Sequence, residues 1–86
     1  MVKVYYNAPA LDKGLDIIEL LALSSEPMTQ AQIASHLNKT VNEIYRMLNT
    51  LKERGYLTFN EKTDQYYLSY KLWTLVSSFN PTKTLI

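Results

Sequence analysis

Residues 28–57, MTQAQIASHLNKTVNEIYRMLNTLKERGYL, predict a short helix, a tight turn, a longer helix and a stop. Thr29 is followed three residues later by Gln32, and Thr40 in the same way by Glu43. Both pairs fit the capping box, in which side chains satisfy backbone N–H groups that the first helical turn leaves unpaired. The two boxes therefore predict two helix starts only eleven residues apart.

The turn and the stop have their own signals. Asn38 tolerates the left-handed backbone conformation that a sharp turn between helices needs. Gly55 follows Arg54 and suits the residue just after a helix end. We therefore expect the longer helix to run from about residue 41 to 54.

The longer helix separates into two faces at about 100° per residue. The apolar stripe consists of Val41, Ile44, Leu48 and Leu51, flanked by Tyr45 and Met47. The opposite face carries Asn42, Arg46, Asn49, Thr50 and Glu53. Amide, hydroxyl and guanidinium groups can bond base edges in a major groove, although any soluble helix has a polar outer face. The short helix, turn and longer helix together favour a helix-turn-helix.

Composition restricts the class of protein. Eighty-six residues, 47% of them hydrophobic, predict one globular domain over 1–86. There is no Cys and a single His, His36, so we expect no disulfide, metal or cofactor. No Gly-rich phosphate loop and no paired carboxylates are found, so an enzyme is not expected. The longest apolar runs predict no membrane span or signal peptide, and we infer a cytoplasmic protein.

Charge gives a weaker signal. The formal net charge is only +1. Residues 1–38 contain two Lys and four acidic residues, whereas residues 39–71 contain six basic and four acidic residues. The positive part of the chain thus coincides with the turn and the longer helix, which a solvated surface of mixed charge explains nearly as well.

A first helix is expected from about residue 10 to 23. Its helically spaced apolar residues are Leu11, Leu15, Ile18, Leu21 and Ala22. Ile17 and Leu20 widen this arc beyond one core face, which suggests a second packing surface for a partner subunit. The alternative is that residues 70–86 cover that side within the same chain.

After Gly55 the pattern changes to that of a β-hairpin. Residues 56–59 and 65–70 have strand composition, and residues 60–64 form a polar loop. Residues 71–79 are again helical, with Leu72, Leu75, Val76 and Phe79 on one stripe and Trp73 off it. We therefore predict a mostly α, α+β fold: a winged helix-turn-helix with a three-helix core, a two-stranded wing (56–70) and a C-terminal helix (71–79).

Four segments in this order resemble the N-terminal DNA-binding domain of IclR-family bacterial transcription regulators. They are ALDKGLDIIELLA (10–22), IYRMLNTL (44–51), ERGYL (53–57) and YYLSYKLWTL (66–75). The resemblance covers a core of about residues 9–79, with the helix-turn-helix at 28–54. It implies a homodimer that binds a palindromic operator in double-stranded DNA and represses or activates nearby genes.

Two departures from the family pattern matter. Asn42 and Glu43 stand where the family usually has a Ser-Thr pair that contacts DNA, so base preference is not carried over. Family members also usually continue into an effector-binding domain, whereas this chain stops at Ile86. An effector is therefore expected only if a further C-terminal domain exists in the full protein.

These observations favour a sequence-specific DNA-binding domain, with residues 41–54 in the major groove and the wing on the backbone or minor groove. The alternative is a winged-helix protein-interaction module that does not bind DNA, which the low net charge and Glu43 favour. The residues expected at DNA are Gln30, Thr40, Asn42, Glu43, Arg46, Asn49, Thr50 and Lys62. Those expected at a dimer interface are Ile17, Leu20 and Trp73.

Overall fold

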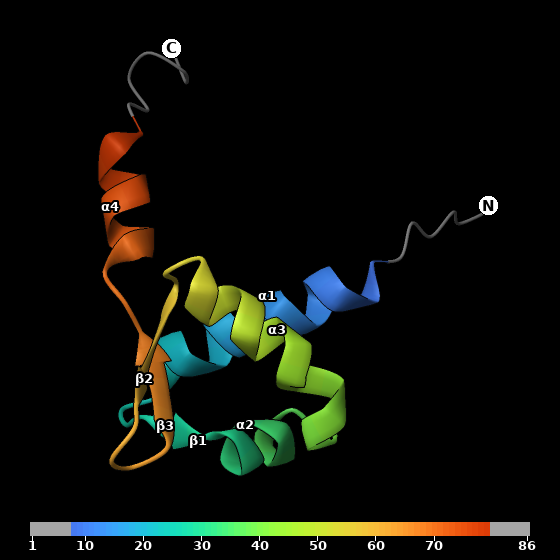
Figure 1. Ribbon diagram of the computed structural model, residues 1–86. Helices are drawn as coiled ribbons and strands as arrows, with labels where there is room; N and C mark the ends of the chain where they lie inside the picture. Colours follow the sequence, from blue (N-terminus) through green and yellow to red (C-terminus); the bar gives the residue numbers. More distant parts are fainter. Residues whose placement is uncertain (1–7, 80–86) are drawn as a thin grey trace, which may run out of the picture.

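The computed structural model describes residues 8–79 and contains four helices and three strands in this range (Figure 1). The expectations for residues 1–7 and 80–86 lie outside the described part. The elements are α1 (Pro9–Leu23), β1 (Met28–Thr29), α2 (Gln30–His36), α3 (Val41–Glu53), β2 (Leu57–Asn60), β3 (Gln65–Leu68) and α4 (Lys71–Ser78). The predicted winged helix-turn-helix is confirmed.

The two predicted helix caps differ in completeness. At α2, the backbone N–H of Thr29 donates to Oε1 of Gln32 at 2.8 Å, and that of Gln32 donates to Oγ1 of Thr29 at 3.2 Å. At α3, the Glu43 N–H donates to Oγ1 of Thr40 at 3.2 Å, but no return bond is found among the described residues. The first capping box is confirmed, and only half of the second one forms.

Two left-handed residues set the chain direction around α3. Asn38, between α2 and α3, has φ 56°, and Gly55, after α3, has φ 87°. A residue other than Gly, Asn or Asp is strained in this region because its Cβ approaches the backbone. The predicted turn and the predicted stop are both confirmed.

The wing is the β2–β3 hairpin, and β1 adds a third strand. The antiparallel order is β1-β3-β2, with Tyr66 of β3 opposite both Met28 and Phe59. The rings of Phe59 and Tyr66 lie 4.7 Å apart between centroids. β2 begins one residue later than expected, at Leu57, and β3 ends two residues earlier, at Leu68.

The core lies where α1, α2, α3 and the sheet meet. Its buried residues are Ile17, Leu21, Ile33, Ala34, Ile44, Leu48, Leu57 and Tyr66. Ile44 and Leu48 of α3 are both completely buried. The predicted inner stripe of α3 is therefore confirmed at its centre, and the opposite face is free for other contacts.

The predicted orientation of α1 is only partly right: Leu21 of the predicted inner stripe is buried, but other positions differ. Ile17, expected on the outer arc, is completely buried, whereas Leu11 and Leu15, expected inside, are 62% and 44% exposed. Because α1 is apolar on nearly two sides, helical spacing alone does not select the side that faces α3 and the sheet. The second apolar surface exists, but Ile17 does not belong to it.

Helix α4 stands away from the body of the domain (Figure 1). None of its residues is buried; Trp73 is 70% and Val76 65% exposed. The alternative in which residues 70–86 cover the outer side of α1 is wrong for residues 70–79, and residues 80–86 lie outside the described range. Within residues 8–79, no helix is long and apolar enough to cross a membrane.

Candidate nucleic-acid interface

The outer face of α3 presents a small polar patch. Asn42, Glu43 and Arg46 are all exposed in the first turn and a half of the helix. Since the reciprocal cap does not form, no hydrogen bond of the Glu43 carboxylate is found in the described part of the chain. The patch thus offers an amide, a carboxylate and a guanidinium side by side.

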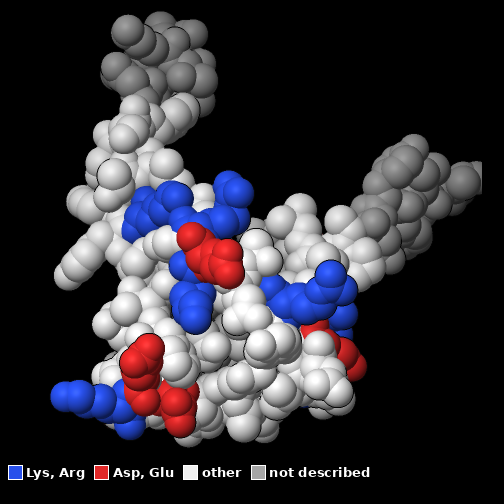
Figure 2. All heavy atoms as spheres, viewed as in Figure 1, with Lys and Arg blue, Asp and Glu red and all other residues white. Residues whose placement is uncertain are grey.

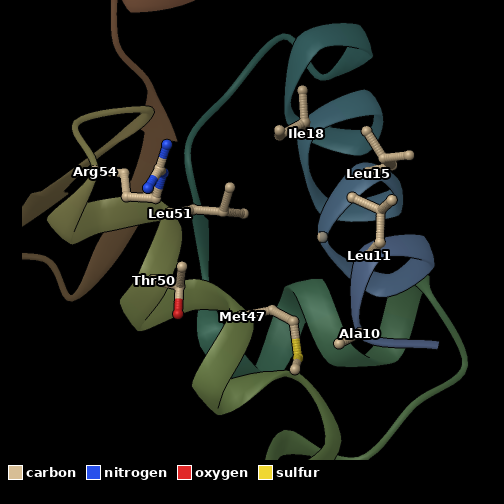
Figure 3. Close-up of a pocket in the computed structure, with 9 residues that line it drawn as sticks. Ala10, Leu11, Leu15, Ile18, Met47, Thr50, Leu51 and Arg54 are labelled. Atoms are coloured by element: carbon tan, nitrogen blue, oxygen red, sulfur yellow. The ribbon is translucent and has the colours of Figure 1, made fainter. Parts of the chain in front are cut away.

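The other predicted residues of this face occupy less open positions. Asn49 is half-buried. Thr50 is exposed but lines a groove that α3 forms with α1, where it lies beside Met47 and Leu51 (Figure 3). The structure therefore places Asn42, Glu43 and Arg46 together and puts Thr50 at the rim of a different surface.

Two predicted backbone-binding residues lie at helix N-termini. Thr40 caps α3 through its hydroxyl, and Gln30 is the half-buried first residue of α2. Helix N-termini favour anions because unpaired N–H groups and the helix dipole point outward there. The backbone N–H groups at these helix ends can bind a phosphate themselves, so neither the Gln30 nor the Thr40 side chain has to be the only donor to it.

The wing tip carries Lys62 with charges of both signs. Asn60 Oδ1 accepts a hydrogen bond of 2.9 Å from the Lys62 N–H, which orders the turn and leaves the lysine side chain exposed. Glu61 and Asp64 flank it, and Figure 2 shows red beside blue at the tip of the wing. A contact between the Lys62 ammonium and a DNA phosphate therefore competes with the attraction of that ammonium to the two neighbouring carboxylates.

Sequence reasoning missed the side of α3 that faces the wing. Tyr45 is 50% exposed, and the Lys52 ammonium lies 5.6 Å from the Phe59 ring centroid on β2. Burial, and then the nearby Tyr45 and Asp64, raise the pKa of Tyr66, so its phenol stays protonated. Tyr45 and Lys52 are seven residues apart, which puts both on one helix face. This spacing is the sequence signal that could have identified the surface.

Basic side chains gather at the C-terminal end of α3 instead of on its outer face. Lys52, Arg54 and Lys71 lie there, near the base of α4 (Figure 2). Arg46 is the single basic residue of the predicted outer face. The positive charge that the sequence places around α3 therefore lies mostly at the C-terminal end of this helix. Base reading does not require basic residues at that end.

An open apolar groove of about 310 Å³ lies between α1 and α3 (Figure 3). Its lining residues are Ala10, Leu11, Gly14, Leu15, Ile18, Met47, Thr50, Leu51 and Arg54. Among them, Thr50 and Arg54 are the polar ones. The groove is the second apolar surface that the sequence predicts for α1, but it is lined by residues other than the predicted Ile17 and Leu20.

A helix–turn–helix followed by an antiparallel wing defines the winged class of DNA-binding domains. The family description "IclR helix-turn-helix domain" matches residues 10–61. The chain belongs to this family. Its function is that of a DNA-binding domain of a transcription regulator.

Curated relatives are consistent with this assignment. The HTH-type transcriptional regulator BhcR of Paracoccus denitrificans is 36% identical over 59 residues, which are 69% of this chain and 21% of that protein. Transcription factor E of Saccharolobus islandicus is 32% identical over 54 residues, which are 63% of this chain and 31% of that protein.

Solved structures share the fold. The IclR transcriptional regulator of Alicyclobacillus acidocaldarius superimposes with a TM-score of 0.79 at 22% identity, covering 84% of this chain and 29% of that one. Thermotoga maritima IclR gives 0.68 at 23% identity, covering 81% and 30%. The chain therefore spans less than a third of the length of these four proteins.

Proposed function

We propose that the domain binds a palindromic operator as a homodimer, with α3 in the major groove and the β2–β3 wing against the backbone. The observation that carries this proposal is the exposed patch of Asn42, Glu43 and Arg46. The patch lies on a helix whose opposite face is fixed in the core by Ile44 and Leu48. A rigid helix with a free polar face is the geometry used for base reading.

Each residue of the patch has a preferred base partner. Arg46 can donate two hydrogen bonds to guanine O6 and N7, and Asn42 can pair with adenine N6 and N7. The Glu43 carboxylate can accept from cytosine N4. Because Glu43 repels phosphate, its presence is consistent with a base contact at the centre of the groove.

Selection of bound sequences from random DNA tests this proposal directly. We expect enrichment of an inverted repeat whose half-sites contain G·C pairs read by Arg46 and Glu43. A gel shift against the enriched and a scrambled duplex at fixed salt then gives the specificity ratio, since nonspecific affinity depends strongly on salt. Recovery of unenriched DNA after repeated rounds would refute sequence-specific binding.

Replacing Lys62 with Ala is expected to lower the slope of log affinity against log salt by roughly one unit, since one phosphate contact and its released counterion are lost. Lys13→Ala, on α1, removes the same charge away from the wing and should leave the slope unchanged. The slope is measured by fluorescence anisotropy across a salt series. An equal slope for Lys62→Ala and the parent would remove the wing tip from the interface.

We expect a monomer–dimer mixture in solution and a dimer on a palindromic site, with α1 and α4 forming the interface. Both helices expose apolar side chains, among them Leu15 and Trp73, and Leu20 is half-buried. Two copies on half-sites about 34 Å or a multiple apart offset the small contact area of one domain.

Analytical ultracentrifugation with and without operator DNA measures the dimer. Leu15→Glu places a charge on the exposed apolar surface and should abolish dimers, whereas Asp16→Glu, its exposed neighbour, should not. A strict one-to-one complex with the full palindrome at saturating protein would contradict the homodimer.

The proposal extends to the cellular role. A dimer that is bound to an operator overlapping a promoter represses the adjacent gene because it occupies the promoter. We propose that the protein performs this role in the cytoplasm. A reporter gene behind the selected operator tests it: repression is expected, and activation would assign the opposite role.

A further inference from the structure

A single junction connects the end of the recognition helix with the start of α4. The ammonium of Lys71, the first residue of α4, donates a hydrogen bond of 2.6 Å to the backbone carbonyl of Arg54, which caps α3. The same ammonium lies 4.9 Å from the ring centroid of Tyr56. Lys71 thus donates to the C-terminal end of α3, and its ammonium lies over the ring of the residue that leads into the wing.

A second set of bonds closes the junction. The Ser69 hydroxyl donates to the carbonyl of Gly55 and accepts from the Lys71 N–H at 3.2 Å. The Ser69 N–H donates to the carbonyl of Tyr56 at 2.9 Å. The backbone before α4 is therefore tied to Gly55 and Tyr56, the two residues that follow the Arg54 carbonyl bonded by Lys71.

The position of Lys71 is unfavourable for its own helix. A positive charge in the first turn opposes the helix dipole, whereas a positive charge beside the last carbonyls of a helix is favourable. Lys71 is in the first turn of α4 and beside the last carbonyls of α3. Its charge therefore serves the contact with α3.

Little else holds α4 in place within the described residues. The helix has no buried residue, and Leu72 is its one half-buried side chain. Figure 1 shows α4 pointing away from α1, α2 and the sheet. The direction of an exposed helix that lacks core packing depends on the contacts at its base.

We propose that Lys71 is a positioning residue that fixes the direction of α4 relative to the recognition helix α3. The ammonium acts as a clamp between the Arg54 carbonyl and the Tyr56 ring. In a homodimer joined through α4, a consequence that rests on the proposed function, the same clamp sets the separation of the two recognition helices.

Distance measurement between two spin labels tests the clamp without DNA. The chain has no Cys, so Ala31→Cys on α2 and Ser77→Cys on α4 place labels at two exposed sites. Labelled protein is diluted with unlabelled protein, so that only distances within one copy are measured. The parent is expected to give one narrow distance peak.

Three variants define the outcome. Lys71→Met keeps the apolar stem but removes the charge and the donors, and should lose the narrow peak. Lys71→Arg keeps the charge, the donors and the ability to lie over an aromatic ring, and should restore the peak. Lys52→Met is the matched control, because the Lys52 ammonium, on α3, also lies over an aromatic ring, that of Phe59 on β2.

An unchanged peak in Lys71→Met overturns the proposal. Equal broadening in Lys71→Arg or Lys52→Met also overturns it, since the effect would then not depend on the Lys71 donor. Circular dichroism of each variant confirms that the helices are retained, as expected when a charge unfavourable to α4 is removed.

Binding to operators with altered half-site spacing tests the consequence for the dimer. The parent should discriminate between spacings, and Lys71→Met should lose this discrimination. If Lys71→Met loses the narrow peak but the parent does not bind DNA, the clamp is supported and the proposed function is refuted. The failure of one proposal can therefore be distinguished from the failure of the other.

Discussion

Replacing Ile17 with Ala is expected to lower the free energy of unfolding by about 2–5 kcal/mol, the range for removing buried methyl and methylene groups and leaving a cavity. Ile17 is completely buried in the core between α1, α3 and the sheet. Because a domain of this size has only about 5–15 kcal/mol of total stability, the variant should unfold at a much lower urea concentration.

The neighbouring residue provides the control. Ile18→Ala makes the same chemical change one position further along α1, so helix propensity changes equally in both variants. Ile18 is only half-buried at the groove, and its loss should cost under about 1 kcal/mol. Equal destabilisation by the two variants would contradict the orientation of α1 described above.

This pair of residues shows what the sequence could predict. The caps at Thr29 and Thr40, the turn at Asn38 and the stop at Gly55 are local, since each depends on hydrogen bonds or backbone angles within a few residues. These features were predicted. The side of α1 that faces the core depends on where α3 and the sheet lie, and a helix that is apolar on nearly two sides contains no signal for that choice.

The same division applies to the candidate interface. The outer patch of α3 follows from helical spacing against Ile44 and Leu48, and the structure keeps Asn42 and Arg46 on it. The approach of Lys52 to the Phe59 ring requires the wing to fold back beside α3. Tertiary packing of this kind leaves no pattern within either segment alone.

The second large effect is expected at DNA. Arg46→Ala should weaken binding to the operator by about 1–3 kcal/mol, or roughly 5- to 150-fold, because a bidentate contact to guanine is lost. Arg46 is exposed in the patch that α3 presents outward. The loss should be concentrated at one base pair: replacing that G·C pair weakens the parent but has little further effect on Arg46→Ala.

Arg54→Ala is the matched control, because it removes the same side chain from the end of the same helix, outside the patch and beside the α1–α3 groove. It should change affinity little and leave base preference intact. Anisotropy titrations of both variants against the operator and its single-base-pair substitutions at fixed salt distinguish base reading from charge attraction. If Arg46→Ala weakened all sequences equally and lowered the salt slope by about one unit, Arg46 would be a phosphate contact. The specificity would then have to come from Asn42 and Glu43.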